Sequence, residues 1–573
     1  MVFDNSVGIS VRGLTEIVPV SFEGHLGAIH RPSGGVGNGT SIVICPAIGR
    51  DGRWTYRTLF LLAEQLARLG YEVLRYDHRG EGDSLGLSVA DNQWAHWLVG
   101  VKQAAQFARS HTTARKLIVA GLRIGATLAS CSAPEVAPDG LILLDPCASG
   151  EAWLRELRLV SAMLAAPQGD IIDVFGLRLS AASIASLERQ AIPLLSGPAV
   201  LLASPKPTKL IADKLGDDVT ITPFTGYADL FKDSHVNEAP VALIDAIVAW
   251  LEPRFGMEKV VLSRASAPVA ELRGRNWVER PVEFGDGLRG VLCKPLRRST
   301  AQAVVLTNTA AEPRAGVGNF TTAACRALAD AGVAALRFDF RGYGESATPN
   351  DGQVHVYETD RLPDLAAAAA LLNGEGFDRL SVAGVCTGGF HSVHAVLDSE
   401  LFEKAIAINS WLVWRPGAKL DLSAFAKSLR SIYWRAPVES RKWTRPLRRM
   451  VRAAVAPRLL WAKRTFKADA TLRQVRQKIR ERLGGERTIH LVFGKEDRAR
   501  EGLQEFGWGG AWLARRQGAS LKVVDQLDHG MFSKTSQALA IKEIFAVLGV
   551  TPPGPAESRS VSAPYAEPAS AMS

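Results

Sequence analysis

The chain contains the same α/β pattern twice, one copy in each half. In the first half, an apolar run at 41–45, an amphipathic stretch at 54–70 and a second apolar run lead to the turn DHRGEGDS. The second half repeats this order and reaches the turn DFRGYGES, so that Asp77 corresponds to Asp339. A repeat whose unit is as long as a whole domain predicts two domains of similar fold.

Each copy continues with an apolar run that stops at a pentapeptide bracketed by glycines, GLRIG at 121–125 and GVCTG at 384–388. Strands that alternate with amphipathic helices at this spacing predict a parallel sheet with helices on both faces. We therefore expect an α/β fold class, with two doubly wound, mostly parallel domains at about 1–255 and 276–550. Segment 256–275 is predicted to be a linker, and the Pro- and Ala-rich segment 551–573 a disordered tail.

Composition supports a globular protein with two full-sized cores, because 47% of the 573 residues are hydrophobic and 22% are charged. The six cysteines are far apart and form no CxxC pair or zinc motif, which predicts a reducing compartment, no structural metal and no cofactor. The N-terminus has no basic and apolar leader, and no run is long enough to span a membrane. We expect a cytoplasmic protein.

The second pentapeptide has the form of a strand that turns sharply into a helix and exposes its middle side chain, Cys386. The N-terminal N–H groups of the following helix favour a thiolate or an oxyanion there. An inert, packed cysteine is the alternative. Because the strand, both glycines and the repeat agree, we predict that Cys386 is a nucleophile.

A thiol nucleophile needs a base, and the base needs an acid to orient it. The strand in TIHLVFGKEDRAR is followed by a loop with Asp497, and the strand in SLKVVDQLDHGMFS by a loop with His529. Asp525 and Asp528 are second choices for the acid. The chain order Cys386, Asp497, His529 is the order of nucleophile, acid and base in one class of hydrolase fold.

The block FDFRGYGES, the pentapeptide GVCTG, the acid Asp497 and the loop DHGMF together resemble the α/β-hydrolase superfamily. Within it they are similar to the serine-aminopeptidase-like and dienelactone-hydrolase-like branches, and the latter also uses a cysteine at this position. The resemblance covers nearly all of both halves and implies two tandem α/β-hydrolase domains. It also implies an oxyanion hole made by the backbone N–H of Thr387 and one from Ala310 or Ala311.

Other polar residues near these motifs are given structural roles. Glu345 and Arg341 belong to a turn, and His391 and His394 are spaced i, i+3 on the helix after Cys386 but have no third metal ligand in view. Segment 141–159 resembles hydrolases associated with bacterial exosortase and surface-polysaccharide gene clusters, which implies a role in exopolysaccharide or acyl decoration.

In the first domain the pentapeptide places Arg123 at the nucleophile position, and a guanidinium cannot attack a carbonyl. Its acid loop has no carboxylate, and Tyr227 stands near the position of the base. His235 lies farther downstream and is expected at the surface. We predict a degenerate domain, in which Arg123 either binds a carboxylate or phosphate or forms a buried ion pair.

A long basic helical cap is expected at 411–487, above the second active site. Residues 415–487 hold 21 Lys and Arg against 5 Asp and Glu, a net charge of +16, whereas the whole chain has +10. Basic helices with interfacial tryptophans suit an anionic membrane surface, and the same charge would attract an acidic acyl substrate. An ordinary solvated lid is the third interpretation, and no nucleic acid is expected.

These observations predict a cytoplasmic enzyme that hydrolyses an ester or thioester through a cysteine acyl-enzyme. If the basic cap binds a membrane, the enzyme is expected to be peripheral to the inner membrane. Its substrate is expected in surface-polysaccharide or lipid-linked acyl metabolism. Two alternatives stay open. One is an acyltransferase with the same triad, and the other is a binding or scaffold protein in which neither domain turns over substrate.

Overall fold

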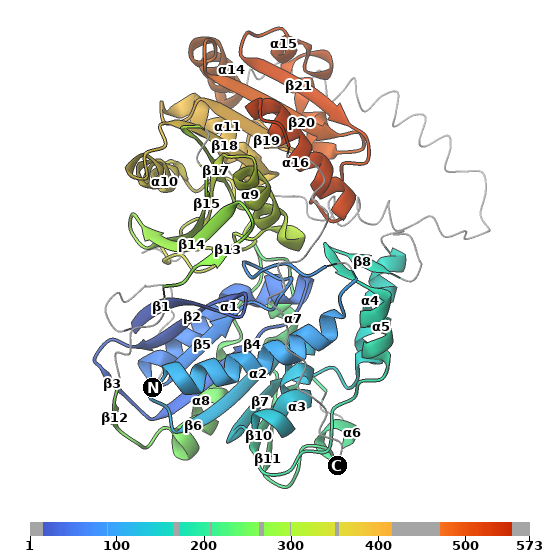
Figure 1. The fold of residues 1–573 in the computed structure, drawn as a ribbon. Coiled ribbons are helices and arrows are strands. Elements are labelled where there is room, and N and C mark those ends of the chain that lie inside the picture. Colours follow the sequence, from blue (N-terminus) through green and yellow to red (C-terminus); the bar gives the residue numbers. More distant parts are fainter. Residues whose placement is uncertain are drawn as a thin grey trace, which may run out of the picture.

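The computed structural model describes residues 15–88, 90–163, 171–206, 209–262, 269–297, 300–349, 355–414 and 470–552. They form two α/β domains, one from each half of the chain, that lie one above the other in Figure 1. The predicted fold class is confirmed, because both large sheets are mostly parallel and have the same strand order.

The sheet of the N-terminal domain has eight strands. The pairs β1·β2 and β2·β5 are antiparallel, and all other neighbours are parallel. In spatial order the strands are β1 (Thr15–Phe22), β2 (His25–Pro32), β5 (Glu72–Tyr76), β4 (Thr40–Cys45), β6 (Lys116–Leu122), β7 (Gly140–Leu144), β10 (Ala199–Ser204) and β11 (Val219–Pro223).

The sheet of the C-terminal domain repeats this order and adds one strand at its first edge. Its parallel part begins at the β17·β16 pair and continues to β21. In spatial order the strands are β13 (Leu272–Arg273), β14 (Trp277–Phe284), β15 (Leu288–Pro295), β17 (Ala334–Asp339), β16 (Gln302–Leu306), β18 (Arg379–Val385), β19 (Lys404–Ile408), β20 (Thr488–Gly494) and β21 (Ala519–Val524).

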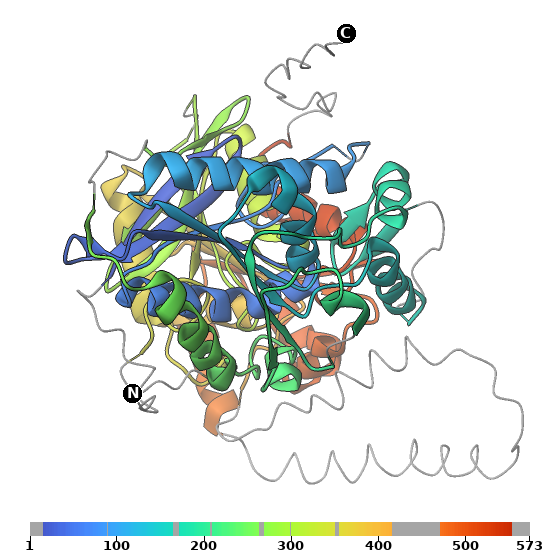
Figure 2. The ribbon, with the colours of Figure 1, turned by 90° about the horizontal axis from the view of Figure 1, so that it is seen from below.

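Helices cover both faces of each sheet, as Figure 2 shows for the N-terminal domain. Successive strand residues point to opposite faces, so each sheet has one buried apolar cluster on either side. The longer helices are α1 (Arg50–Arg68), α2 (Gln93–His111), α3 (Ile124–Val136), α4 (Gly150–Met163), α5 (Ala181–Glu188), α8 (Val241–Phe255), α9 (Phe320–Asp330), α10 (Leu362–Gly374), α11 (Thr387–Asp398), α14 (Ala470–Arg482) and α16 (Lys534–Leu548).

The repeated turns of the two domains hold the domains together. Gly82, in the turn of the N-terminal domain, donates its N–H to Asn319 Oδ1 at the start of α9, with N and Oδ1 2.9 Å apart. In the reciprocal contact, Arg57 on α1 donates to the carbonyl oxygens of Gly344 and Ser346, both at 2.8 Å. Each turn therefore docks against the first helix of the other domain.

The segment predicted as a linker contributes two strands of two residues each. β12 (Val260–Val261) pairs with β3 (Val36–Gly37) of the N-terminal domain, and β13 joins the C-terminal sheet. Strands of two residues are too short to show the alternation of apolar and polar residues by which a strand is predicted from a sequence. Most of the predicted cap, at 415–469, and the predicted tail from 553 onward lie outside the described residues.

Within the described ranges, no helix has the length and apolar character needed to cross a bilayer.

Candidate active site

Cys386 lies at the turn between strand β18 and helix α11, as the sequence predicts. Its backbone has φ 55° and ψ −115°, a left-handed conformation that is strained for a residue with a side chain. A Cβ at Gly384 would overlap the Thr307 side chain, and one at Gly388 would overlap the Asn308 carbonyl group. The two glycines therefore let the turn approach the loop after β16, and Cys386 remains partly exposed.

His529 and Asp497 lie together beside this turn, at the carboxyl ends of β21 and β20. The His529 Nδ1 atom donates to Asp497 Oδ2 at 2.7 Å. The Asp497 side chain is 1% exposed and its other oxygen accepts from the Ala499 N–H at 2.8 Å, whereas the His529 side chain is 29% exposed. The charge of His529 acts on the Cys386 thiol, and each of these two side chains shifts the pKa of the other.

The loop that carries His529 is held by polar side chains. Asn409, directly after β19, donates to the carbonyl oxygens of Asp528 at 2.8 Å and His529 at 3.3 Å, and accepts from the Gly494 N–H. Asp528 accepts from the N–H groups of Phe532 and Ser533, so its carboxylate supports the loop. Asp525 is exposed and pairs with a lysine. Of the three candidate acids, Asp497 is the one seen to hydrogen-bond the His529 ring.

Tyr357 is a residue of this site that sequence reasoning missed. Its hydroxyl lies 3.6 Å from the Cys386 sulfur. The Tyr357 ring stacks on Trp414, with centroids 4.2 Å apart and an angle of 8° between the planes, and meets Phe390 edge-on. Tyr357 comes from the irregular segment before α10, which has no periodicity or motif that could have identified it.

The electrostatics of the site favour a thiolate beside an imidazolium. Burial alone would raise the pKa of the Cys386 thiol, but the positive charge of His529 and hydrogen bonds from His529 and Tyr357 outweigh it and lower that pKa. Burial would lower the pKa of His529, but the Cys386 thiolate and the hydrogen bond to Asp497 raise it. Each partner thus stabilises the charged form of the other.

The loop expected to complete the oxyanion hole lies against α11. The Ala310 N–H donates to the Thr387 side-chain hydroxyl at 2.7 Å, and Ala310 itself has a positive φ of 49°. The Ala310 amide is therefore engaged by Thr387 in this conformation and is not directed at a substrate. Thr387 is the first residue of α11, and the N–H of Ala311 is the other candidate donor in this loop.

The other polar residues singled out in the sequence lie outside the Cys386 cluster. Glu345 faces the N-terminal domain and Arg341 pairs with Asp364. His391 is buried against the Val356 carbonyl oxygen, and His394 lies 3.4 Å from Asp398. In the part of the chain that the structure describes, no three His, Cys, Asp or Glu side chains are grouped to hold a metal.

The N-terminal domain keeps the strained turn without a nucleophile. Arg123 has φ 55° and ψ −125°, close to the values of Cys386. Its guanidinium contacts three carboxylates, Asp145 at 2.8 Å, Asp51 at 3.4 Å and Glu156. Three negative charges around one positive charge leave no attraction for a further anion, which favours the ion pair over anion binding. Burial and the nearby Asp145 raise the pKa of Tyr227, and His235 is partly buried, not fully at the surface.

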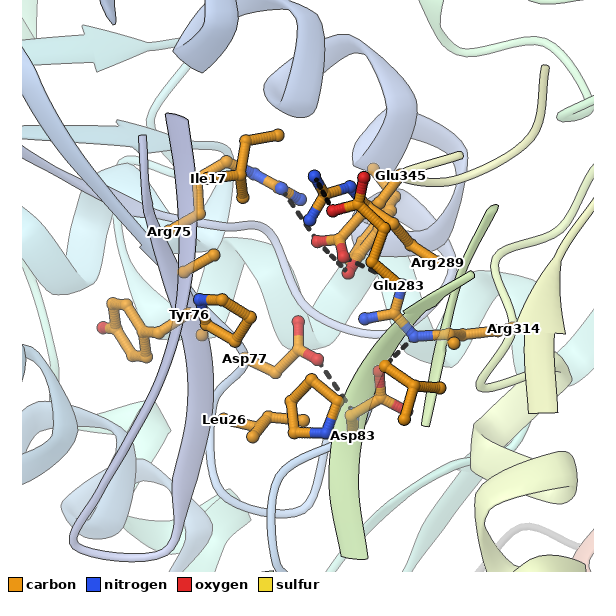
Figure 3. A pocket seen from close by; sticks show the side chains of 17 residues that line it. Ile17, Leu26, Arg75, Tyr76, Asp77, Asp83, Glu283, Arg289, Arg314 and Glu345 are labelled. Atoms are coloured by element: carbon orange, nitrogen blue, oxygen red, sulfur yellow. Dashed lines mark hydrogen bonds and ion pairs between the residues drawn. The ribbon is translucent and has the colours of Figure 1, made fainter. Parts of the chain in front are cut away.

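A cavity of about 150 Å³ lies at the domain interface and not at Cys386. Figure 3 shows that charged side chains from both domains converge on it. Asp77 and Arg75 come from the N-terminal domain, and Arg314, Arg289 and Glu345 from the C-terminal domain. Burial and the neighbouring Asp83 raise the pKa of Asp77 to about 7. A second hollow of about 310 Å³ lies behind the Asp497 loop and is lined by neither Cys386 nor His529.

A mostly parallel sheet that carries a strained turn, an acid and a histidine at its carboxyl edge defines the class of α/β hydrolases. Residues 52–175 match the family model described as serine aminopeptidase, S33, and residues 315–541 match the model of the alpha/beta hydrolase family. Each half of the chain thus contains a match to an α/β-hydrolase family model, and both domains have the strand order of this fold.

Solved structures similar to this chain include an α/β serine hydrolase without a lid from Xanthomonas campestris, at 15% identity and a TM-score of 0.29, over 42% of this chain and 96% of that one. A Pyrococcus furiosus esterase matches at 16% identity and a TM-score of 0.32, over 47% of this chain and 90% of that one. A Pyrococcus horikoshii acylaminoacyl peptidase matches at 15% identity and a TM-score of 0.31, over 48% of this chain and 41% of that one. No curated protein matches the chain.

Proposed function

We propose that the C-terminal domain is a cysteine hydrolase that cleaves an ester or thioester through an acyl-enzyme on Cys386. The observation that carries the proposal is the hydrogen bond from the His529 ring to Asp497 Oδ2, at the edge of the sheet that holds Cys386 on the strained turn of an α/β-hydrolase fold. The opposite pKa shifts of Cys386 and His529 support the pairing of these two side chains. This chemistry needs a nucleophile, a base and an orienting acid, and we assign these roles to Cys386, His529 and Asp497.

In the first half-reaction, the Cys386 thiolate attacks the acyl carbon and forms a tetrahedral intermediate. The Thr387 N–H, at the positive end of α11, stabilises its oxyanion. The intermediate then expels the alcohol or thiol, which takes its proton from the imidazolium of His529, and the acyl group remains on sulfur. Water next attacks the acyl-enzyme while His529 accepts its proton, and the acid product leaves as the thiolate re-forms.

Tyr357 is assigned to the resting state of the nucleophile. Its hydroxyl can donate to the thiolate at 3.6 Å, which is within range for sulfur, and thereby holds the negative charge before attack. Once sulfur is acylated the charge is gone, and that hydroxyl is released. Asp497 orients the imidazole and stabilises its charged form.

Esters and thioesters are preferred to amides as substrates because of the leaving group. A thiolate is itself a good leaving group, so an intermediate formed from an amide returns to substrate unless the amine is protonated first. The link to surface-polysaccharide or lipid-linked acyl metabolism stays a prediction from the sequence. So does an anionic substrate or membrane surface at the basic segment 411–487.

Intact-protein mass spectrometry after brief exposure to p-nitrophenyl esters and acyl thioesters tests the proposal. We expect an acyl adduct that is absent in Cys386→Ala and kept in Cys131→Ala, because Cys131 is the other partly exposed cysteine among the described residues. An adduct that is released by an added alcohol but not by water would indicate an acyltransferase. If a broad ester panel gives neither an adduct nor hydrolysis, the result favours the binding protein.

A further inference from the structure

The N-terminal domain contacts the C-terminal domain at the two loops that build the candidate active site. One is the loop after β16, residues 309–319, which lies against α11 beside Cys386. The other is the loop with His529, residues 525–533, which leads into α16. Both loops follow the ends of strands, and the sheet alone does not fix their position.

The hairpin β8 (Ile172–Val174) and β9 (Leu177–Leu179) of the N-terminal domain reaches the loop with His529. At its tip, the Phe175 ring meets Phe532 edge-on, with centroids 5.1 Å apart. The neighbouring Gly176 has φ 80°, and its Cα approaches Gly318 so closely that a Cβ on Gly176 would overlap the Gly318 Cα. Phe532 lies three residues after His529, so a contact that holds Phe532 also helps to hold the loop that carries His529.

Two ion pairs hold the loop after β16 from the same side. Arg53 Nη1 lies 2.7 Å from Glu312 Oε2, and the two side chains are 10% and 11% exposed. Arg314 Nε lies 2.8 Å from Asp83 Oδ2, and both side chains are buried. Glu312 and Arg314 belong to the C-terminal loop, whereas their partners Arg53 and Asp83 belong to the N-terminal domain.

The two loops are also bound to each other. Gln537 Nε2 donates to the Val317 carbonyl oxygen at 3.0 Å and to the Met531 carbonyl oxygen at 2.9 Å. Lys534 Nζ donates to the Gly318 carbonyl oxygen at 2.6 Å. A displacement of either loop is therefore passed to the other through α16.

We propose that the degenerate N-terminal domain is a positioning domain, whose β8–β9 hairpin and Arg53 hold the His529 loop and the loop after β16 at the Cys386 nucleophile. The inference rests on the proposed function, and it gives the N-terminal domain a task that requires no chemistry of its own. Gly176, Phe175 and Arg53 are positioning residues because each acts through a loop and none contacts Cys386.

The effect on the reaction follows from geometry. A catalytic group displaced by about 1 Å can cost about a hundredfold in rate. His529 is also the main source of the lowered pKa of Cys386, after burial has opposed it. A shifted His529 loop must therefore slow acylation and return the thiol pKa toward the ordinary value of about 8.5.

Gly176→Ala in the full chain tests the proposal, with Gly35→Ala as its matched control. Both glycines lie in tight turns between strands of the N-terminal domain with similar φ, 80° and 69°, but a Cβ on Gly35 meets nothing within 4 Å. The two substitutions thus add similar backbone strain from the positive φ. Only the new Cβ of Gly176→Ala overlaps an atom of the other domain, so only this variant should push the domains apart. The readouts are the pH dependence of Cys386 alkylation by iodoacetamide, followed on the Cys386 peptide, and kcat and KM for the best ester.

We expect Gly176→Ala to lower kcat about a hundredfold with little change in KM, and to move the alkylation midpoint upward. Gly35→Ala should have the kcat and the alkylation midpoint of the wild type. If Gly176→Ala does not fold, Phe175→Ala, which removes the ring from Phe532, is expected to move both readouts in the same direction by about tenfold in kcat.

The outcomes separate the two proposals. Variants at Gly176 and Phe175 that fold and keep the wild-type midpoint and kcat would overturn the positioning role alone. A wild-type Cys386 that alkylates with an ordinary midpoint and forms no acyl adduct would overturn the proposed function, and with it the inference that rests on it.

Discussion

Arg337 of the C-terminal domain and Asp83 of the N-terminal domain form an ion pair across the domain interface, with Nε and Oδ1 2.8 Å apart and both side chains buried. The repeat makes Arg75 the equivalent of Arg337 and Glu345 the equivalent of Asp83, and this second pair is also formed, at 3.0 Å. Each domain thus places the same arginine against the same turn acid of the other. The two domains of one chain are therefore arranged like the subunits of an isologous dimer, in which each subunit contributes the same contacts to the interface.

Asp83→Asn is expected to destabilise the whole chain by about 3 kcal/mol, because it removes a charge that serves Arg337 and Arg314 together in a buried site. Urea denaturation followed by tryptophan fluorescence measures this. The exposed Asp245 on α8 provides the control Asp245→Asn, which should stay within about 0.5 kcal/mol of the wild type. Equal midpoints for the two variants would mean that the interface pair contributes nothing net.

Much of the fold and the position of Cys386 on the turn could be predicted, because both follow from local sequence patterns. The repeated strand runs determine the topology, and the two glycines around Cys386 are required by close backbone contacts, so their spacing identifies the turn. Asp497 and His529 follow strands that end at the same edge of the sheet. Chain order and strand ends are enough to place Asp497 and His529 at the edge of the sheet that carries Cys386.

The remaining features depend on tertiary contacts that leave no pattern in the sequence. Tyr357 lies in an irregular segment and reaches Cys386 only because its ring is packed between Trp414 and Phe390. The Ala310 N–H is turned toward Thr387 by a positive φ that nothing in the sequence indicates. Glu345 was correctly placed in a turn, but its partner Arg75 is known only once the domains are docked.

Tyr357→Phe removes one hydroxyl from the nucleophile and should leave the aromatic stacking in place. We expect the pKa of Cys386 to rise, because one of the hydrogen bonds that lower it is lost, and kcat/KM near neutral pH to fall about tenfold. The pH profile of Cys386 alkylation measures the first effect and ester kinetics the second. Tyr343→Phe, at a buried tyrosine outside the site, is the control. An unchanged midpoint in Tyr357→Phe would refute the contact.

The pH profile of kcat/KM should have two limbs that enclose a thiolate–imidazolium plateau. Activity rises with pH as Cys386 loses its proton, and this limb lies below the ordinary thiol value of about 8.5 because the pKa is lowered. Activity falls as His529 loses its proton, and that limb lies above the ordinary value of about 6.5 because the pKa is raised.

Asp497→Asn distinguishes this assignment from an isolated cysteine. The hydrogen bond to Asp497 helps to raise the pKa of His529, so its loss should move the alkaline limb to lower pH and narrow the plateau. The rate on the plateau should fall about a thousandfold or more, because the imidazole loses its orientation. A single ionisation near 8.5 that is identical in the wild type and in Asp497→Asn would contradict the pairing.

Arg123→Met tests whether the Arg123 guanidinium has a structural role. Its removal leaves Asp51, Asp145 and Glu156 facing one another, so we expect a loss of about 2 kcal/mol at pH 7. Burial raises the pKa of Glu156 against the pull of Arg123, and the loss of Arg123 raises it further. The deficit is therefore full at pH 7 and shrinks as the pH falls and Glu156 takes up a proton. Urea denaturation at pH 7 and 4.5 measures the difference. An anion site behaves in the opposite way, since sulfate would then stabilise the wild type at pH 7 and leave Arg123→Met unaffected.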